Sequence, residues 1–338
     1  MRGISLGRKS PQIGALIVVT ALLAGGAGAA AGTGTAHAAK KVTIAYIQKQ
    51  GDQLYFIDEA NGAKKEAAKL GAKVIVTNVG SDSDKAISAV QTAIAQKVSA
   101  IAIVVPDQKI GPQVIDLAKK ANIPLVASDD SIKNSSGKDA AFVGFNGTQM
   151  GTKVGTDAAR LYKASGWKAA DTRVISSAKQ DLSVCTDRTK AAIAAFKKQV
   201  GSNAPTVIDL GTDNSVTDAQ NKAGATVTAN PGVKHWVVWG CNDENVSGVV
   251  TALANANFGA NDVIGVGLGA YLGCKDWKAG QKTGFKSALF IDGHNVGSAA
   301  VQVLYDKVAK GKALPPKTVA KTVMVNASNW KKSGLVCS

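Results

Sequence analysis

The 338-residue sequence has few aromatic residues, few histidines and few cysteines. Phe, Trp and Tyr make up 5% of the chain, and there are three His and four Cys. Nucleic-acid binding needs clustered basic residues and stacking side chains. Here the 40 Lys and Arg residues, against 24 Asp and Glu, are dispersed at helical surface spacings. We therefore expect a basic, lysine-rich surface that binds no nucleic acid.

The sequence also lacks the motifs of common catalytic and metal sites. It contains no CxxC pair, no HExxH, no GxSxG and no P-loop, and Gly265, Gly267 and Gly269 lack the GxGxxG spacing. Beyond the N-terminal segment only His235 and His294 are available as a histidine base. We therefore expect no catalytic residue, no metal and no cofactor.

No apolar run is long enough to span a bilayer. The longest, residues 13–23 (IGALIVVTALL), has eleven residues against the roughly 20 that a membrane helix needs. Basic residues precede it, and Ala36 and Ala38 form a small-x-small cleavage site. This pattern predicts a signal peptide over residues 1–38 and export to the periplasm or cell envelope. No Cys lies near the cleavage site, so we expect no lipid anchor.

Beyond residue 40, short apolar runs alternate with segments of helical periodicity. The runs are continuous, as in parallel strands that are buried on both faces. Strands are predicted near residues 42–47, 74–76, 101–105, 125–127, 173–176, 206–210, 236–239, 263–266 and 288–291. The alternation restarts after a glycine-rich stretch at 144–155, which predicts an α/β protein with two doubly wound parallel-sheet lobes.

A helix near residues 296–310 and a strand near 322–325 remain after the second lobe is complete. Their position predicts that the chain returns to the first lobe and then crosses again. We expect an N-terminal lobe of residues 39–146 and 293–320. The C-terminal lobe then takes residues 147–292 and 321–338.

Polar residues follow most of the predicted strands. In open parallel sheets, ligands bind beyond the carboxyl ends of the strands. That rule selects Lys49 and Gln50, Pro106 and Asp107, Asp129 and Asp130, the loop 179–188, Asn242 and Asp243, and residues 267–271. Such carboxylates, amides and basic groups match sugar hydroxyls, which both donate and accept hydrogen bonds. Tyr55 and Phe56 could pack on the apolar face of a sugar ring.

Four segments carry a family resemblance: IAYIQKQGDQLYF, VASDDSIKN, PGVKHWVVWGCNDENVSG and DVIGVGLGA. In order and spacing they resemble the periplasmic sugar-binding proteins, and most closely the arabinose-binding branch, over about residues 41–330. The resemblance implies the type I periplasmic-binding-protein fold, with two lobes joined by a three-strand hinge. It also implies a monosaccharide ligand between the lobes and an ABC transporter permease as partner. We expect the protein to be a monomer.

The resemblance assigns roles to four residues. It implies that Lys49 bonds a sugar hydroxyl, that Asp130 grips the anomeric end, that Arg188 points at the ring oxygen and that Asn242 is a pocket amide. Each also has a structural interpretation. Lys49 could be a solvated loop residue, Asn242 a helix N-cap, and one of Asp129 and Asp130 a turn cap. Arg188 could pair on a helix surface with a nearby carboxylate, either residue 181 or 187.

Four positions depart from the arabinose-type pattern. Gln53 replaces a pocket Glu, Tyr55 a stacking Trp, Phe145 a Met beside the sugar, and Gly269 a second Asn. Gly269 offers no side-chain hydrogen bond, so the resemblance leaves the identity of the pentose, hexose or polyol open. Phe56 is expected in the core rather than as a platform.

Two other functions remain open from the sequence. A sensor subunit that presents its sugar to a receptor kinase or chemoreceptor would have the same closed form as an import receptor. An exported carbohydrate-active enzyme is the remaining alternative, although the catalytic motifs are missing.

Export favours disulfides among the four cysteines. By analogy with a doubly wound lobe, the strand ending at Ser176 lies beside the strand ending at Trp239, which brings Cys185 near Cys241. We predict that pair and, for the remaining two, Cys274 with Cys337. A bond between Cys241 and Cys274 is also geometrically conceivable.

Overall fold

The computed structural model describes residues 41–337. The predicted signal peptide, residues 1–38, lies outside the described residues. No described helix combines the length and apolar character required to cross a membrane.

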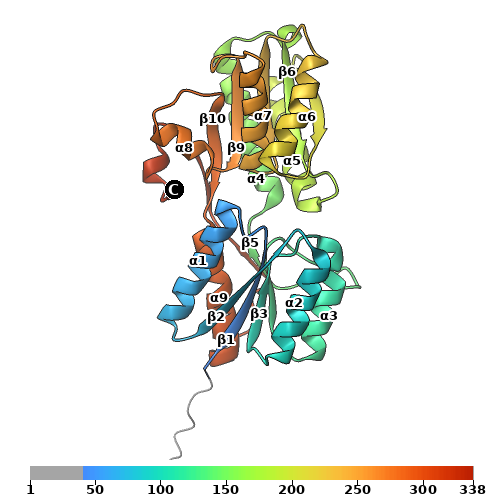
Figure 1. Ribbon diagram of the computed structural model, residues 1–338, viewed down its shortest axis with the longest axis vertical. Coiled ribbons are helices and arrows are strands. Elements are labelled where there is room, and N and C mark those ends of the chain that lie inside the picture. Colours follow the sequence, from blue (N-terminus) through green and yellow to red (C-terminus); the bar gives the residue numbers. More distant parts are fainter. Residues whose placement is uncertain (1–40, 338) are drawn as a thin grey trace, which may run out of the picture. The chain divides into compact units, whose positions relative to one another are not determined.

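The first of two six-stranded sheets has the order β11-β5-β4-β3-β1-β2, and all its paired strands are parallel. Its strands are β1 (Thr43–Lys49), β2 (Lys73–Gly80), β3 (Ala100–Ile103), β4 (Leu125–Asp129), β5 (Phe142–Gly144) and β11 (Lys317–Val319). The helices beside it are α1 (Leu54–Lys69), α2 (Ser83–Ala95), α3 (Gly111–Lys120) and α9 (Gly293–Lys310). Figure 1 shows α1 and α9 on one face of this sheet and α2 and α3 on the other.

The second sheet has the order β12-β10-β9-β8-β6-β7. Its strands are β6 (Thr172–Ala178), β7 (Thr206–Gly211), β8 (His235–Gly240), β9 (Val263–Gly269), β10 (Phe285–Ile291) and β12 (Thr322–Asn326). Only β12 is antiparallel to its neighbour, with Val325 opposite Ala288 of β10. The remaining helices are α4 (Gly147–Ser165), α5 (Ser183–Val200), α6 (Val216–Thr228), α7 (Asp243–Asn255) and α8 (Gly273–Lys278), with short 3-10 turns η1 (Gln108–Ile110), η2 (Ala169–Asp171) and η3 (Trp330–Lys332).

Strand β1 shows why the apolar runs are continuous. Ile44 and Tyr46 pack into the core under α1 and α9, whereas Ala45 and Ile47 pack into a separate core under α2 and α3. Successive side chains of a strand point to opposite faces. A sheet covered by helices on both faces therefore needs apolar residues at every position.

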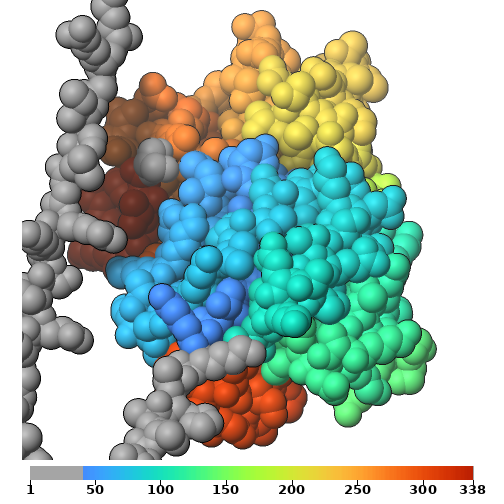
Figure 2. Space-filling view, turned by 60° about the horizontal axis from the view of Figure 1, so that its bottom comes forward, coloured from blue at the N-terminus to red at the C-terminus, as the bar shows by residue number. Residues whose placement is uncertain are grey.

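The chain passes between the two sheets three times: from β5 to α4, from β10 to α9, and from β11 to β12. Helix α9 returns to α1, where Ser298 Oγ donates to the Gly62 carbonyl 3.1 Å away. A Cβ atom at Gly297 would lie 1.9 Å from the Glu59 carbonyl oxygen, so only glycine permits this approach. In the space-filling view the orange-red end of α9 lies beside the blue N-terminal strand region (Figure 2).

Both predicted disulfides are confirmed. Cys185 bonds Cys241 with a Cα–Cα distance of 5.0 Å, and Cys274 bonds Cys337 with 5.8 Å. One local expectation is wrong: the loop expected over residues 179–188 ends where α5 begins, at Ser183, so Arg188 lies on the helix. Strands β5 and β11 were not predicted, because three-residue strands give too little periodicity.

Candidate ligand-binding site

A pocket lies between the carboxyl ends of the two sheets. The empty space among its lining side chains, open solvent included, is about 580 Å³. Ten residues were expected to bind the ligand. Nine of them line this pocket: Lys49, Gln53, Tyr55, Phe56, Asp129, Asp130, Arg188, Asn242 and Gly269. Phe145 lines a neighbouring crevice instead, where its ring centroid is 6.4 Å from that of Tyr55.

Lys49 and Asp130 form a buried ion pair in the first lobe. Lys49 ends β1 and Asp130 follows β4, and the two residues are 7% and 2% exposed. The interpretation of Lys49 as a solvated loop residue is therefore wrong. Asp130 Oδ1 has no hydrogen-bond partner within residues 41–337 and is buried. One oxygen of this carboxylate pairs with Lys49, and the other has no partner in the described chain.

Asp129 is held by Tyr55, whose hydroxyl donates to Asp129 Oδ1 at 2.8 Å. Burial and the charge of Asp130 raise the pKa of Asp129, while Arg188 and Lys49 lower it. Neither of the two adjacent aspartates caps a turn through its side chain in the described part of the chain. The hydrogen bond to Asp129 fixes the phenol of Tyr55 at the pocket wall. The ring of Phe56 lies edge-on to it, with 5.0 Å between the two ring centroids.

A further buried carboxyl group, Glu59, lies behind this wall and was not identified from the sequence. Glu59 Oε1 accepts hydrogen bonds from Tyr46 and Ser128, both at 2.6 Å. Burial and the charge of Asp129 raise the pKa of Glu59 to about 8. Glu59 sits within the charged α1 segment, where an acidic residue normally indicates solvent exposure, so the sequence carried no signal for it.

Arg188 reaches the pocket from the second turn of α5 and is 7% exposed. Its Nη1 donates to the Cys241 carbonyl at 3.1 Å, and its Nε has no partner in the described chain. Asp181 pairs with Lys179 instead. The surface-pair interpretation of Arg188 is therefore wrong, and this pocket-lining residue keeps one buried guanidinium donor without an acceptor in the described chain.

Asn242 is the N-cap of α7, as its structural interpretation predicted. Its Oδ1 accepts from the Asn245 backbone N–H at 3.1 Å, and its Nδ2 donates to the Asn214 carbonyl at 3.0 Å. Asn242 also lines the pocket, so capping and pocket lining coincide in one residue.

Asp243 also lines the pocket, although the resemblance gave it no role. It is buried, its Oδ2 accepts from the Leu272 N–H at 3.0 Å, and its Oδ1 lacks a partner among the residues described. Burial raises the pKa of Asp243 to about 6, although several backbone N–H groups lower it. A signal was present, because Asp243 is among the residues that follow predicted strands.

Gly269 makes room for this carboxylate. A Cβ atom at Gly269 would lie 3.3 Å from the Asp243 carboxyl carbon, and the φ angle of +135° disfavours other residues. Asp292 and Asn295, the other polar residues near this hinge crossing, do not line the pocket. Asp292 instead caps α9 by accepting from the Asn295 N–H at 2.9 Å.

Strained backbone concentrates at the pocket. Gln50, Asp129 and Asn214 line it with φ angles of 44°, 58° and 72°, and Ala270, at 69°, follows Gly269. Residues with side chains rarely adopt positive φ, and such strain persists where surrounding structure imposes it, often at functional sites.

Two hydrogen-bonded contacts join the lobes beside the pocket. Gln108 Oε1 of the first lobe accepts from Ser183 Oγ and from the Val184 N–H, the latter at 3.3 Å. Tyr271 of the second lobe donates to Asp58 Oδ2 of α1 at 2.7 Å. Both pairs can form only when the lobes approach one another.

The fold and the pocket together define a two-lobed protein with a pocket between its lobes. A family model described as "Periplasmic binding protein domain" matches residues 44–313. The chain belongs to this family, which confirms the type I fold expected from the sequence.

Similar proteins agree with that assignment. The chain is 29% identical to an ABC transporter L-arabinose-binding periplasmic protein of Azospirillum brasilense, covering 88% of this chain and 90% of the relative. It is 27% identical to the L-arabinose-binding periplasmic protein of Escherichia coli, covering 87% and 90%. Among solved structures, a periplasmic solute-binding protein of Actinobacillus succinogenes with bound D-allose superposes with a TM-score of 0.76 at 22% identity, covering 86% of this chain and all of that one.

Proposed function

We propose that this protein is an exported, monomeric receptor that binds a monosaccharide or related polyol between its lobes and delivers it to the permease of an ABC importer. The observation that carries this proposal is a set of three buried, unpartnered polar atoms that belong to residues lining one pocket. Asp130 Oδ1, Arg188 Nε and Asp243 Oδ1 have no partner in residues 41–337. Buried groups of this kind are costly unless something satisfies them.

A sugar suits these three atoms because each hydroxyl both donates and accepts. The two carboxylate oxygens would accept from ligand hydroxyls, and the guanidinium would donate to a ring or hydroxyl oxygen. Charge-assisted hydrogen bonds of this type are about twice as strong as neutral ones. Tyr55 and Phe56 add an apolar wall for the C–H face of the ring.

The charges at the pocket favour a neutral ligand over an acidic one. Four acidic residues line it, namely Asp129, Asp130, Asp243 and Glu244, against the two bases Lys49 and Arg188. Lys49 is already engaged by Asp130. An anionic ligand, such as a uronic acid or a sugar phosphate, would meet excess negative charge.

Transport would follow from closure of the lobes. The first lobe supplies Lys49 and Asp130, and the second supplies Arg188, Asn242 and Asp243. A ligand that contacts both sets stabilises the closed form over the open form, and the closed form is what an importer would recognise. The names of the relatives, which include ABC transporter components, support this partner.

A thermal-shift screen tests the proposal. Residues 39–338 would be melted with L-arabinose, D-ribose, D-allose, D-galactose and myo-inositol, and with glucuronate as the acidic comparison. A ligand that binds only the native state raises the melting temperature. We expect at least one neutral compound to do so and glucuronate to have no effect. An Arg188→Ala variant should lose the shift, and no shift with any sugar or polyol would overturn the proposal.

A further inference from the structure

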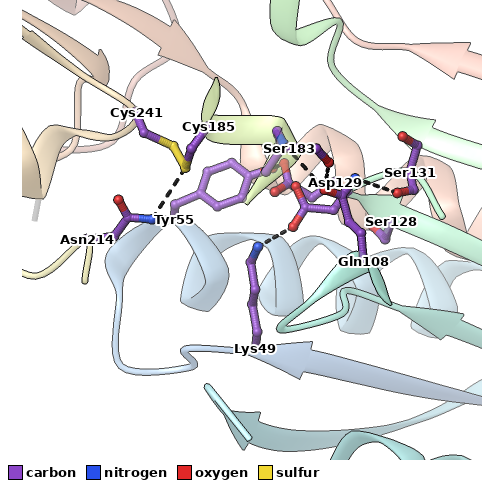
Figure 3. A network of polar contacts seen from close by, with 12 residues as sticks. Lys49, Tyr55, Gln108, Ser128, Asp129, Ser131, Ser183, Cys185, Asn214 and Cys241 are labelled. Atoms are coloured by element: carbon purple, nitrogen blue, oxygen red, sulfur yellow. Dashed lines mark hydrogen bonds and ion pairs between the residues drawn. A yellow bond between two sulfur atoms is a disulfide. The ribbon is translucent and has the colours of Figure 1, made fainter. Parts of the chain in front are cut away.

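The two disulfides lie in different surroundings. Cys185 and Cys241 both line the ligand pocket, whereas Cys274 and Cys337 do not. Cys185 lies one helical turn before Arg188 on α5, and Cys241 directly precedes Asn242 and Asp243. The first disulfide therefore joins two of the segments that carry the second lobe's pocket side chains. Figure 3 shows this bond beside Tyr55 and Asn214.

The Cys185–Cys241 bond is connected to Arg188 by direct contacts. The only hydrogen-bond acceptor of Arg188 in the described chain is Cys241, through its carbonyl at 3.1 Å and, more weakly, its Sγ at 3.8 Å. Asn214 Nδ2 lies 3.4 Å from Cys185 Sγ on the other side. Both cysteines are at most 2% exposed. A shift of Cys241 would therefore remove the group that orients the guanidinium.

The start of α5 has no side-chain cap. Leu182 occupies its N-cap position and provides no side-chain hydrogen bond, whereas α2, α4, α6, α7 and α9 all have side-chain caps. The Val184 N–H in the first turn of α5 donates to Gln108, which belongs to the other lobe. That bond is lost when the lobes separate. In the open form, the disulfide and the apolar cluster of Ala178, Leu182, Cys185 and Cys241 tie this turn to its own lobe.

We infer that the Cys185–Cys241 disulfide is a positioning element of the ligand site, so that sugar affinity depends on its being oxidised. The bond holds Arg188 in the orientation that ligand binding needs before the lobes close. A site that is already ordered loses less conformational entropy on binding. This inference rests on the proposed function, because sugar affinity is its readout.

The second disulfide provides a matched control. Cys274–Cys337 joins α8 to the C-terminal segment and spans 63 positions, against 56 for Cys185–Cys241. Disulfides that close loops of similar length constrain the unfolded chain to a similar degree. The two bonds should therefore stabilise the fold to a similar extent, and only one should affect the pocket.

The experiment compares Cys185→Ala/Cys241→Ala with Cys274→Ala/Cys337→Ala. Melting temperature and Kd would be measured for L-arabinose, D-ribose, D-allose, D-galactose and myo-inositol, using the compound that the unmodified protein binds most tightly. We expect both double variants to melt at lower temperature. Only Cys185→Ala/Cys241→Ala should raise Kd, by at least tenfold, or about 1.4 kcal/mol. An unchanged Kd in that variant, or an equal rise in both, would overturn the inference.

A double-mutant cycle tests whether the disulfide acts through Arg188. Removing Cys185–Cys241 in an Arg188→Lys background should raise Kd by clearly less than tenfold, since the guanidinium that it orients is already gone. Fully additive losses would contradict the positioning role.

A second measurement covers the case in which the alanine variant does not fold. The unmodified protein would be reduced under native conditions, the opened bond identified by peptide mapping, and Kd measured again. Weakened binding that tracks opening of Cys185–Cys241 supports the inference, and undiminished affinity after its opening refutes it. If the unmodified protein binds none of the five compounds, the proposed function fails and the inference fails with it.

Discussion

The two halves of the pocket are built on different principles. In the first lobe, Lys49 pairs with Asp130 and Tyr55 bonds Asp129, so charged and polar groups are matched largely among themselves. In the second lobe, Arg188 and Asp243 are held by backbone groups rather than by an oppositely charged side chain of the described chain. Asp130, Arg188 and Asp243 each keep a buried polar atom without a partner among residues 41–337. Stability and binding should therefore be coupled in the first half and separable in the second.

The physical reason is the cost of burying charge. Removing one member of a buried ion pair leaves the other charge uncompensated, which destabilises the fold. A side chain whose buried donor has no protein acceptor contributes less to the folded state, and its loss is felt when a ligand should supply the acceptor.

The largest expected effect tests the first half. Asp130→Ala leaves the buried Lys49 ammonium without its partner, so the free energy of unfolding should fall by about 3–5 kcal/mol. Denaturant titration measures this change. Asp139→Ala is the control, because Asp139 pairs with Lys133 where both side chains are more than half exposed. That variant should change stability by less than about 1 kcal/mol, and equal losses in the two variants would refute the coupling.

Arg188→Ala tests the second half. We expect it to weaken binding of the best sugar by about 3 kcal/mol, more than a hundredfold in Kd, because the ligand oxygen and the Cys241 carbonyl lose a charged donor. The melting temperature should change much less than in Asp130→Ala. If calorimetry finds the affinity of this variant unchanged, Arg188 does not contribute to ligand binding. A loss of stability as large as that of Asp130→Ala would show that stability and binding are coupled in the second half as well.

The sequence predicted the positions of the pocket residues better than their partners. The alternation of apolar runs placed the strand ends, and the strand-end rule then found Lys49, Asp130 and Asn242. It could not show that Lys49 is paired and buried, because a lysine after a strand has the same local pattern whether or not a carboxylate from another strand meets it. The same limit applies to Arg188, whose acceptor is 53 positions away.

Phe145 and Glu59 differ from the sequence expectation for different reasons. Phe145 was placed beside the sugar by resemblance alone, and it lines the next crevice. Glu59 was overlooked because its partners Tyr46 and Ser128 come from two separate strands. Contacts between distant segments decide both positions, and a single sequence does not encode them as a local pattern.

The pH dependence of stability offers a subtler test of the first half. Burial raises the pKa of Glu59 from 4.5 to about 8. The folded protein therefore binds a proton more tightly than the unfolded chain does. The resulting stabilisation is fully present below about pH 4.5 and is lost as the pH rises through about 8. We expect the unfolding free energy to be higher at pH 5 than at pH 8 by at least about 1.4 kcal/mol, the value of one pKa unit.

Glu59→Gln should flatten this dependence, since the amide keeps an oxygen for Tyr46 and Ser128 but does not titrate. Hydrogen bonds from Lys310 and Lys312 lower the pKa of Asp306 to about 2, so Asp306→Asn should leave the slope between pH 5 and 8 unchanged. Denaturant titrations at both pH values measure the slope. An unfolding free energy that rises from pH 5 to pH 8 would contradict the raised pKa of Glu59.

The smallest expected effect concerns which sugar fits the two halves together. Relative to the arabinose-type pattern, the first half has changed at Gln53, and the second has Gly269 beside Asp243. A carboxylate oxygen only accepts hydrogen bonds, whereas an asparagine amide also donates. The second half therefore lacks a donor at this position and favours a ligand with a hydroxyl that donates there. We predict that L-arabinose is not the tightest ligand and that another monosaccharide or polyol binds at least tenfold better, about 1.4 kcal/mol. Calorimetric titration of a pentose, hexose and polyol series measures the ranking. A series led by L-arabinose would mean that Asp243 fully replaces the missing amide and that the second half has kept its specificity despite Gly269.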